Sequence, residues 1–334
     1  MPWVGDLQFR DLVDDVVVLP RPASSKIGDK FRALQDGAAE LRAYAEKHGA
    51  WDIGYSLPNS FSAAFLLWRS GVKARIGYEV DGRGILLNEG RRWNADAGRH
   101  RAQAYVDLLA PSQRPKRPVR DFWGLHPEND LDPGVPGELK NFDVARFWPK
   151  ADTLEPSPGP YWVLSPGATA ESRRWPPEFF IRLAQQVFES TGMVGYIVGG
   201  PAEAVMAQEL MEKVNDDDVV RLIDVTASCS VPGLWKLFRG SNFTVCNESG
   251  LAHVAALCGA FVQIVCGAAD PMRTCPLGPG RVQVAVNPVE CWPCERNTCM
   301  QPPAQKIQCL RGIRPSTVWE EIQRGVKLAA LIQA

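Results

Sequence analysis

The sequence lacks the features of a membrane-inserted or secreted chain. No apolar stretch approaches the roughly 18 uninterrupted residues that a membrane helix needs. The first residues include acidic side chains in place of the basic run and apolar core of a signal peptide. The net charge is only −1, which leaves no overall positive field to attract nucleic acid. We therefore predict a cytoplasmic protein that has no nucleic-acid partner.

Cysteine is absent before Cys229, and all nine cysteines follow from that position onward. This distribution differs from that of a disulfide-stapled secreted domain and fits a reduced protein with one specialised segment. Five cysteines stand among apolar residues, where a free thiol behaves as a small core side chain: Cys229, Cys246, Cys258, Cys266 and Cys275. We expect these five to be packing residues.

The other four cysteines form a Cys-rich segment at 291–309. They follow the pattern Cys-x2-Cys-x4-Cys-x9-Cys, at Cys291, Cys294, Cys299 and Cys309. Four thiolates can close a tetrahedral structural zinc site, and the first pair has the spacing of a zinc knuckle. The later spacing is not that of a standard zinc ribbon, so reduced or paired thiols are the alternative. No histidine lies nearby in the sequence, so we do not expect an open catalytic metal site.

Length and composition favour two globular α/β domains. The 334 residues are 45% hydrophobic and 22% charged, a soluble balance with enough chain for two cores. A stretch dense in proline and polar residues runs from 111 to 160, which predicts domains at 1–154 and 155–334.

In the second half, short β-rich runs alternate with helical patterns, as in a doubly wound parallel sheet. The expected strands there are 161–164, 194–198, 219–223, 243–246 and 261–265, with helices at 178–190 and 249–258.

The first half shows the same alternation more weakly. The expected strands are 15–19, 52–57 and 74–77, and the expected helices are 31–48, 61–70 and 95–109. About a dozen residues precede the first expected strand, too few for the strand, turn and helix that usually open such a domain. We therefore expect the first domain to lack its first βα unit.

Three turns that follow expected strands carry candidate ligand-binding residues. Ser165 and Gly167 precede the paired arginines Arg173 and Arg174, a Gly turn with cations that suits phosphate; the alternative is a tight turn with a solvated pair. Gly199 and Gly200 form a second such turn, which lacks the dinucleotide fingerprint and so predicts no NAD.

The third turn runs from Asn247 into an expected helix. The N-terminus of that helix can bind phosphate or a hydroxyl-rich ligand, and the residues placed there are Glu248, Ser249, Gly250 and His253. A carboxylate such as Glu248 can bind sugar hydroxyls. The alternatives are capping by Asn247 or Ser249 and a buried, hydrogen-bonded His253.

Two clusters of basic residues lie in the first half. One contains Arg91, Arg92, Arg99, His100 and Arg101, and the other contains Arg114, Lys116, Arg117 and Arg120. They are either solvated or form an anion-binding surface. The second interpretation predicts an acidic acceptor and weak contact with a membrane surface.

Together these motifs resemble the heptosyltransferases of glycosyltransferase family 9, most of all the lipopolysaccharide heptosyltransferase II branch. The resemblance covers nearly the whole chain and rests on the order and spacing of the motifs. The matching segments are 52–61, 75–78, 83–88, 165–168, 173–176, 199–200, 247–253, 267–271 and the Cys-rich segment.

The resemblance implies a GT-B-like fold, with two Rossmann-like domains facing across a cleft. It also implies inverting transfer of heptose from ADP-heptose to the acidic inner core of lipopolysaccharide, without a metal cofactor and with peripheral contact at the inner membrane. Arg173 would serve the diphosphate, and Glu248, Ser249, Gly250 and His253 would line the donor site.

Three positions depart from the family pattern. Arg173 stands where the family usually has lysine, and Glu248 where it usually has aspartate. The family's catalytic base is an aspartate after a glycine following the first strand. Gly5-Asp6 offers that dipeptide without a preceding strand, so Asp6 is the candidate base.

These departures leave three hypotheses: an active transferase, either with Asp6 as base or with a start further upstream; a truncated nucleotide-sugar-binding relative; or a transferase for another sugar.

Overall fold

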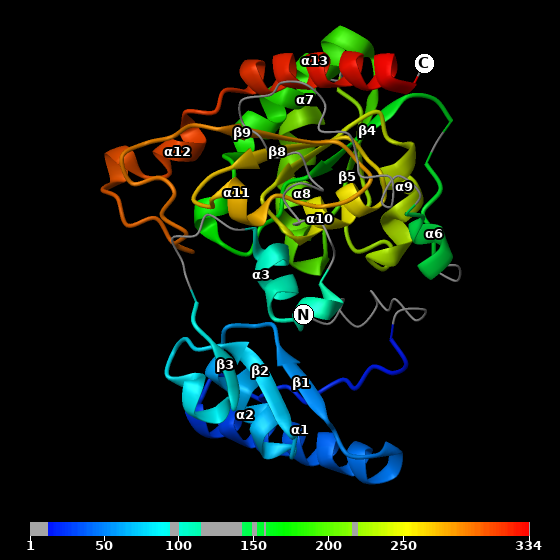
Figure 1. Cartoon of the computed structure of the whole chain (residues 1–334). Coiled ribbons are helices and arrows are strands. Elements are labelled where there is room, and N and C mark those ends of the chain that lie inside the picture. The colour runs from blue at the N-terminus through cyan, green and yellow to red at the C-terminus, as the bar shows by residue number, and fades with distance from the viewer. Residues whose placement is uncertain are drawn as a thin grey trace. The chain divides into compact units, whose positions relative to one another are not determined.

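The computed structural model describes residues 13–93, 100–114, 142–148, 152–156, 158–215 and 220–333 (Figure 1). Among them, residues 13–114 belong to one compact unit and residues 142–333 to another. We call these the N-terminal unit and the C-terminal unit. No helix within the described ranges is long and apolar enough to cross a membrane.

The N-terminal unit contains a parallel three-stranded sheet in the order β1-β2-β3. Its strands are β1 (Ile53–Ser56), β2 (Ala74–Tyr78) and β3 (Glu89–Arg91), and its helices are α1 (Ile27–His48), α2 (Phe61–Arg69) and α3 (Arg101–Asp107). Ile76 and Tyr78 lie two positions apart on β2, so their side chains share a face of the sheet, and Ala104 and Leu108 at α3 pack against them.

The predicted strand at 15–19 is wrong, because this segment forms no ladder. It lies along α1 instead: the Tyr44 hydroxyl donates to Asp15 Oδ2 at 2.8 Å, and Leu19 lies beside Gly37. Val18 is 71% exposed, so the apolar residues that suggested a strand are only partly used in packing. The other predicted strands and helices of this unit form, within a few residues of the expected bounds over the described range.

The C-terminal unit contains a parallel six-stranded sheet in the order β6-β5-β4-β7-β8-β9. The strands are β4 (Tyr161–Ser165), β5 (Val194–Ile197), β6 (Leu222–Asp224), β7 (Thr244–Asn247), β8 (Val262–Cys266) and β9 (Val282–Val286). The chain order reverses between β4 and β7. Ligands of such sheets bind beyond the carboxyl ends of the strands at this switch point.

Helices cover this sheet and connect its strands (Figure 1). The helices are α6 (Val144–Phe147), α7 (Pro177–Thr191), α8 (Ala204–Asn215), α9 (Trp235–Gly240), α10 (Gly250–Leu257), α11 (Pro271–Thr274), α12 (Gln308–Arg311) and α13 (Pro315–Gln333). The sequence predicted α7 and α10 but neither β9 nor α13. The two parallel sheets confirm the predicted α/β class.

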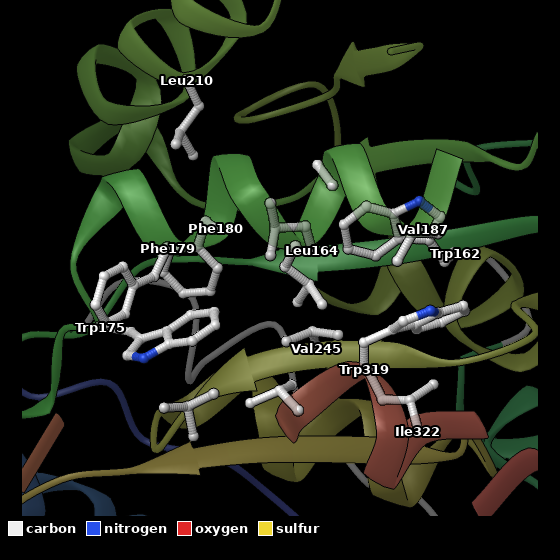
Figure 2. Close-up of a cluster of buried hydrophobic side chains, with 14 of the residues drawn as sticks. Trp162, Leu164, Trp175, Phe179, Phe180, Val187, Leu210, Val245, Trp319 and Ile322 are labelled. Atoms are coloured by element: carbon white, nitrogen blue, oxygen red, sulfur yellow. The ribbon is translucent and has the colours of Figure 1, made fainter. Parts of the chain in front are cut away.

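β4 is buried on both faces, which explains its continuous apolar sequence. Trp162 and Leu164 enter the cluster drawn in Figure 2, which also contains Phe180 on α7 and Trp175 in the turn before it. Tyr161 and Val163 enter a second cluster, on the opposite face. Each large apolar side chain buried in this way contributes roughly 1.5–3 kcal/mol.

Residues 142–148 and 152–154 pack with the C-terminal unit. Val144 and Trp148 are buried in the same cluster as Tyr161, and the Leu154 amide donates to Gly233 O at 3.1 Å. The described residues of the C-terminal unit therefore begin at 142, earlier than the predicted domain boundary at 154/155. The reason is that a few apolar side chains in a proline-rich stretch join the core of this unit.

Candidate functional site

The candidate site lies at the carboxyl ends of β4 and β7, beside the switch point, and Asn247 joins the two loops there. Its side chain is fully buried. Asn247 Nδ2 donates to Pro166 O at 2.5 Å, and Asn247 Oδ1 accepts from the Trp175 amide at 3.0 Å. The turn after β4, the start of α7 and the end of β7 are thereby held as one assembly.

Arg173 and Glu248 meet at this assembly. Arg173 Nη1 lies 3.0 Å from Glu248 Oε2, and the side chains are 27% and 8% exposed. The pair lacks hydrogen-bond geometry, and neither Arg173 Nε nor Glu248 Oε2 has a hydrogen-bond partner in the described part of the chain. Buried polar groups in native proteins are nearly always hydrogen-bonded, so these atoms make the assembly the candidate site.

Ser249 adds a third unpaired polar atom. It occupies the N-cap position of α10, yet it makes no capping bond, and its buried Oγ has no hydrogen-bond partner among the described residues. Asn247 is committed to Pro166 and Trp175, so the prediction that one of these two side chains caps the helix is wrong. His253 is exposed on α10, so its interpretation as a buried imidazole is also wrong.

The paired arginines differ in their surroundings. Arg174 is exposed and bonds the turn itself: Nε donates to Ala168 O at 2.6 Å and Nη2 to Thr169 O at 3.2 Å. Within the described ranges, the Arg173 side chain makes only the charge contact with Glu248. Of the two, Arg173 is therefore the better placed to bind an anion.

Glu203 contacts both predicted Gly turns and explains two of their glycines, Gly167 and Gly199. Its Oε2 accepts from the Gly200 amide at 2.8 Å. A Cβ on Gly167 would lie 2.5 Å from Glu203 Cγ, and one on Gly199 would lie 2.7 Å from Glu203 Cβ. The turns after β4 and β5 thus both contact the side chain of Glu203. Sequence reasoning gave Glu203 no role, although a carboxylate three residues after a turn residue is a capping pattern.

The sequence profile of glycosyltransferase family 9 (heptosyltransferase) matches residues 45–305. The chain belongs to this family. Lipopolysaccharide heptosyltransferase 2 of Salmonella typhimurium is 23% identical over 258 residues, which are 73% of this chain and 68% of that protein. Lipooligosaccharide heptosyltransferase 2 of Haemophilus influenzae is 25% identical over 303 residues, 82% of this chain and 84% of that protein.

The solved structure of E. coli ADP-heptose lipopolysaccharide heptosyltransferase II has a TM-score of 0.62 to this chain at 22% identity. The match covers 91% of this chain and 82% of that one. It shows that the chain has the heptosyltransferase fold, the GT-B class that the family resemblance implied. As a member of the family, the chain is a glycosyltransferase.

The Cys-rich segment of this family member packs against the candidate site. Trp292 Nε1 donates to Gly267 O and the Glu295 amide donates to Ala268 O, both at 2.8 Å. The Ser172 amide, next to Arg173, donates to Asn297 O at 3.2 Å. The segment therefore supports the loop that carries Arg173.

The four cysteines of the segment line one cavity of about 550 Å³, with Met300 and several polar side chains. Cys299 Sγ accepts from the Ile307 amide at 3.3 Å. All nine cysteines are free thiols, and within the described ranges no three or more His, Cys, Asp or Glu side chains are placed to hold a metal ion. A bound zinc ion would require these thiols to move closer together. Structural zinc therefore stays a prediction, which metal analysis of the purified protein can test.

The packing role predicted for the other cysteines is confirmed for four of them, which are buried: Cys246, Cys258, Cys266 and Cys275. Burial raises the pKa of Cys258, Cys266 and Cys275 to about 12, so these thiols are protonated at neutral pH. Cys229 is half-buried.

Part of the predicted basic surface has internal roles. Arg91 Nη1 donates to Asp107 O at 2.5 Å, and Arg114 Nη2 donates to the same carbonyl at 2.8 Å, so both cations stabilise the end of α3. His100 is buried, and its Nδ1 accepts from the Ala102 amide. The predicted residues Arg99, Lys116, Arg117 and Arg120, and the candidate base Asp6, lie outside the described residues.

Proposed function

We propose that this family member is an inverting transferase that moves heptose from ADP-heptose to the inner core of lipopolysaccharide. The observation that carries the proposal is a group of buried polar atoms on Arg173, Glu248 and Ser249 that have no hydrogen-bond partner among the described residues, beside the switch point of the sheet. The group combines a cation, a carboxylate and a hydroxyl, which together suit a sugar diphosphate.

Two solved structures of one relative support the choice of donor. The solved E. coli heptosyltransferase WaaC with ADP has a TM-score of 0.55 to this chain, and the same enzyme with ADP-2-deoxy-2-fluoro heptose has 0.53, each at 18% identity. The relatives compared by sequence are named for lipopolysaccharide or lipooligosaccharide, which supports the acceptor class. Since that acceptor is a lipid, we also expect peripheral contact with the inner membrane.

In the proposed reaction, a base removes the proton of an acceptor hydroxyl, and its oxygen attacks the anomeric carbon opposite the diphosphate. The bond from that carbon to the diphosphate oxygen breaks, and ADP leaves. Arg173 Nε and the N-terminus of α10 would neutralise charge as it develops on the diphosphate. Glu248 Oε2 would accept a hydrogen bond from a hydroxyl of the donor, and Asp6 would be the base.

The test is acceptor-dependent ADP release from ADP-heptose, with heptose-deficient lipopolysaccharide as acceptor. Arg173→Met is expected to lower kcat by about 10²- to 10³-fold, the usual loss when one preorganised donor to the developing charge is removed. Arg182→Met is the matched control, because Arg182 is exposed on α7 of the same unit.

ADP release by the unaltered chain and the control but not by Arg173→Met supports the proposal. Binding of ADP-heptose without release indicates the nucleotide-sugar-binding protein instead. Release from a different nucleotide-sugar, with none from ADP-heptose, would assign another donor. Equal rates for the two arginine variants would remove Arg173 from the mechanism.

A further inference from the structure

Arg83 is a fully buried cation of the N-terminal unit that the proposed reaction does not use. It begins a single helical turn, Arg83–Leu86, after β2. Burial lowers the pKa of its guanidinium, and no carboxylate of the described residues forms an ion pair with it. Taking an arginine out of water is costly, so a buried arginine without a paired carboxylate has a specific task.

That task is to hold the loop at the carboxyl end of β1, residues 57–60. Arg83 Nη1 donates to Ser56 Oγ at 3.0 Å, and also to Pro58 O and Ser60 O. Arg83 Nη2 donates to Asn59 Oδ1 at 2.9 Å, while Nε donates to Tyr78 O on β2 at 2.6 Å. One planar guanidinium thus ties the loop to the neighbouring strand.

These bonds determine what the loop presents to its surroundings. Three of its oxygen atoms, on Pro58, Asn59 and Ser60, face the guanidinium and are used there. Asn59 is exposed, and because its Oδ1 is turned inward, its Nδ2 group is turned outward. Nδ2 makes no hydrogen bond to the described residues. The loop therefore offers a fixed donor over a buried positive charge.

We propose that Arg83 is a positioning residue for the acceptor: it fixes the 57–60 loop so that Asn59 Nδ2 donates a hydrogen bond to an oxygen of the acceptor saccharide. The inference rests on the proposed function and extends it to the second substrate. The position agrees with the rule that ligands of parallel sheets bind beyond the carboxyl ends of the strands. A donor above a buried cation suits an anionic or hydroxyl-rich sugar.

The experiment measures kcat and KM for both substrates in Asn59→Ala, Arg83→Lys and Arg83→Met. Asn59→Ala is expected to raise the acceptor KM about tenfold, the effect of one hydrogen bond. Arg83→Met should raise it further, and Arg83→Lys should recover part of the loss, since lysine keeps the charge without the planar fork. The donor KM should not change, because Arg173 and Glu248 lie in the other unit.

Gln35→Ala and Arg32→Met are the controls, since both residues are exposed on α1 of the same unit. Asn59 is exposed, so Asn59→Ala tests the inference even if Arg83→Met does not fold. An acceptor KM for Asn59→Ala equal to that of Gln35→Ala would overturn it, as would equal changes in the donor and acceptor KM.

Acceptor binding separates this inference from the proposed function. Calorimetric titration with the delipidated inner-core saccharide needs no transfer. If the unaltered chain releases no ADP, the proposed function fails, yet weaker saccharide binding by Asn59→Ala would still support the inference. Unchanged saccharide binding by Asn59→Ala would overturn it, whatever the transfer rate.

Discussion

Replacement of Asn247 by alanine should unfold the C-terminal unit at a clearly lower temperature. The side chain is fully buried and satisfies two backbone groups, the Pro166 carbonyl and the Trp175 amide. Alanine leaves both groups buried without a partner, and each such group costs about 1–3 kcal/mol. The expected loss is about 2–6 kcal/mol, which corresponds to a fall in Tm of roughly 5–20 °C for a unit of this size.

Asn242→Ala is the matched control. Asn242 Oδ1 also accepts a backbone hydrogen bond, from the Tyr161 amide at 3.1 Å, but Asn242 is exposed, so water can replace it. We expect a loss below about 1 kcal/mol there. Thermal unfolding followed by tryptophan fluorescence compares the two, because Trp175 lies beside Asn247. Equal Tm values for the two variants would refute the role of Asn247 in holding the Pro166 and Trp175 loops together. Unchanged ADP-heptose affinity in Asn247→Ala would show that this role does not affect the proposed donor site.

Three further predictions concern the base, the metal and pH. Asp6→Asn should lower kcat by about 10²-fold or more while Asp14→Asn does not; equal rates would exclude Asp6 as the base. Prolonged chelation should leave the transfer rate unchanged, because the proposed reaction uses no metal; a lower rate would contradict this. Metal analysis of the same sample measures whether the Cys-rich segment holds zinc. Burial raises the pKa of Glu321 and outweighs the lowering by the hydrogen bond that Gln263 Nε2 donates to it, so the folded state holds its proton to higher pH than the unfolded state. Stability should therefore fall as pH rises from about 4.3 through the raised pKa; Glu321→Gln should remove that slope in urea titrations, and an unchanged slope would contradict the assignment.

Local patterns in the sequence were enough for the α/β class and for most strands. The strand β4 is a short apolar run that ends in Ser165, Pro166 and Gly167, and buried strands with turn residues after them are recognisable without tertiary information. The same signals placed Arg173 and Glu248 after strands of one parallel sheet. Their common edge follows from the topology of a parallel sheet, so their proximity could be predicted from sequence.

What the sequence did not determine depends on partners far along the chain. Asn247 bonds Pro166 across 81 positions, so capping of the next helix was the nearer interpretation of its side chain. Ser172 meets the Cys-rich segment across 124 positions, a contact that no local pattern indicates. The hydrogen bond from Arg83 to Asn59 joins residues 24 positions apart, which follow two different strands. Residues 15–19 had a strand-like composition but lie along α1.

The sequence by itself determined which residues carry charge and where strands end, because these depend on residue type and local periodicity. Only the tertiary structure decided which of those groups are paired. Arg174 bonds its own turn, whereas Arg173, one residue earlier, is left beside Glu248 with an unpaired Nε. Hydrogen-bond satisfaction is a property of the whole packed unit, and no local pattern encodes it.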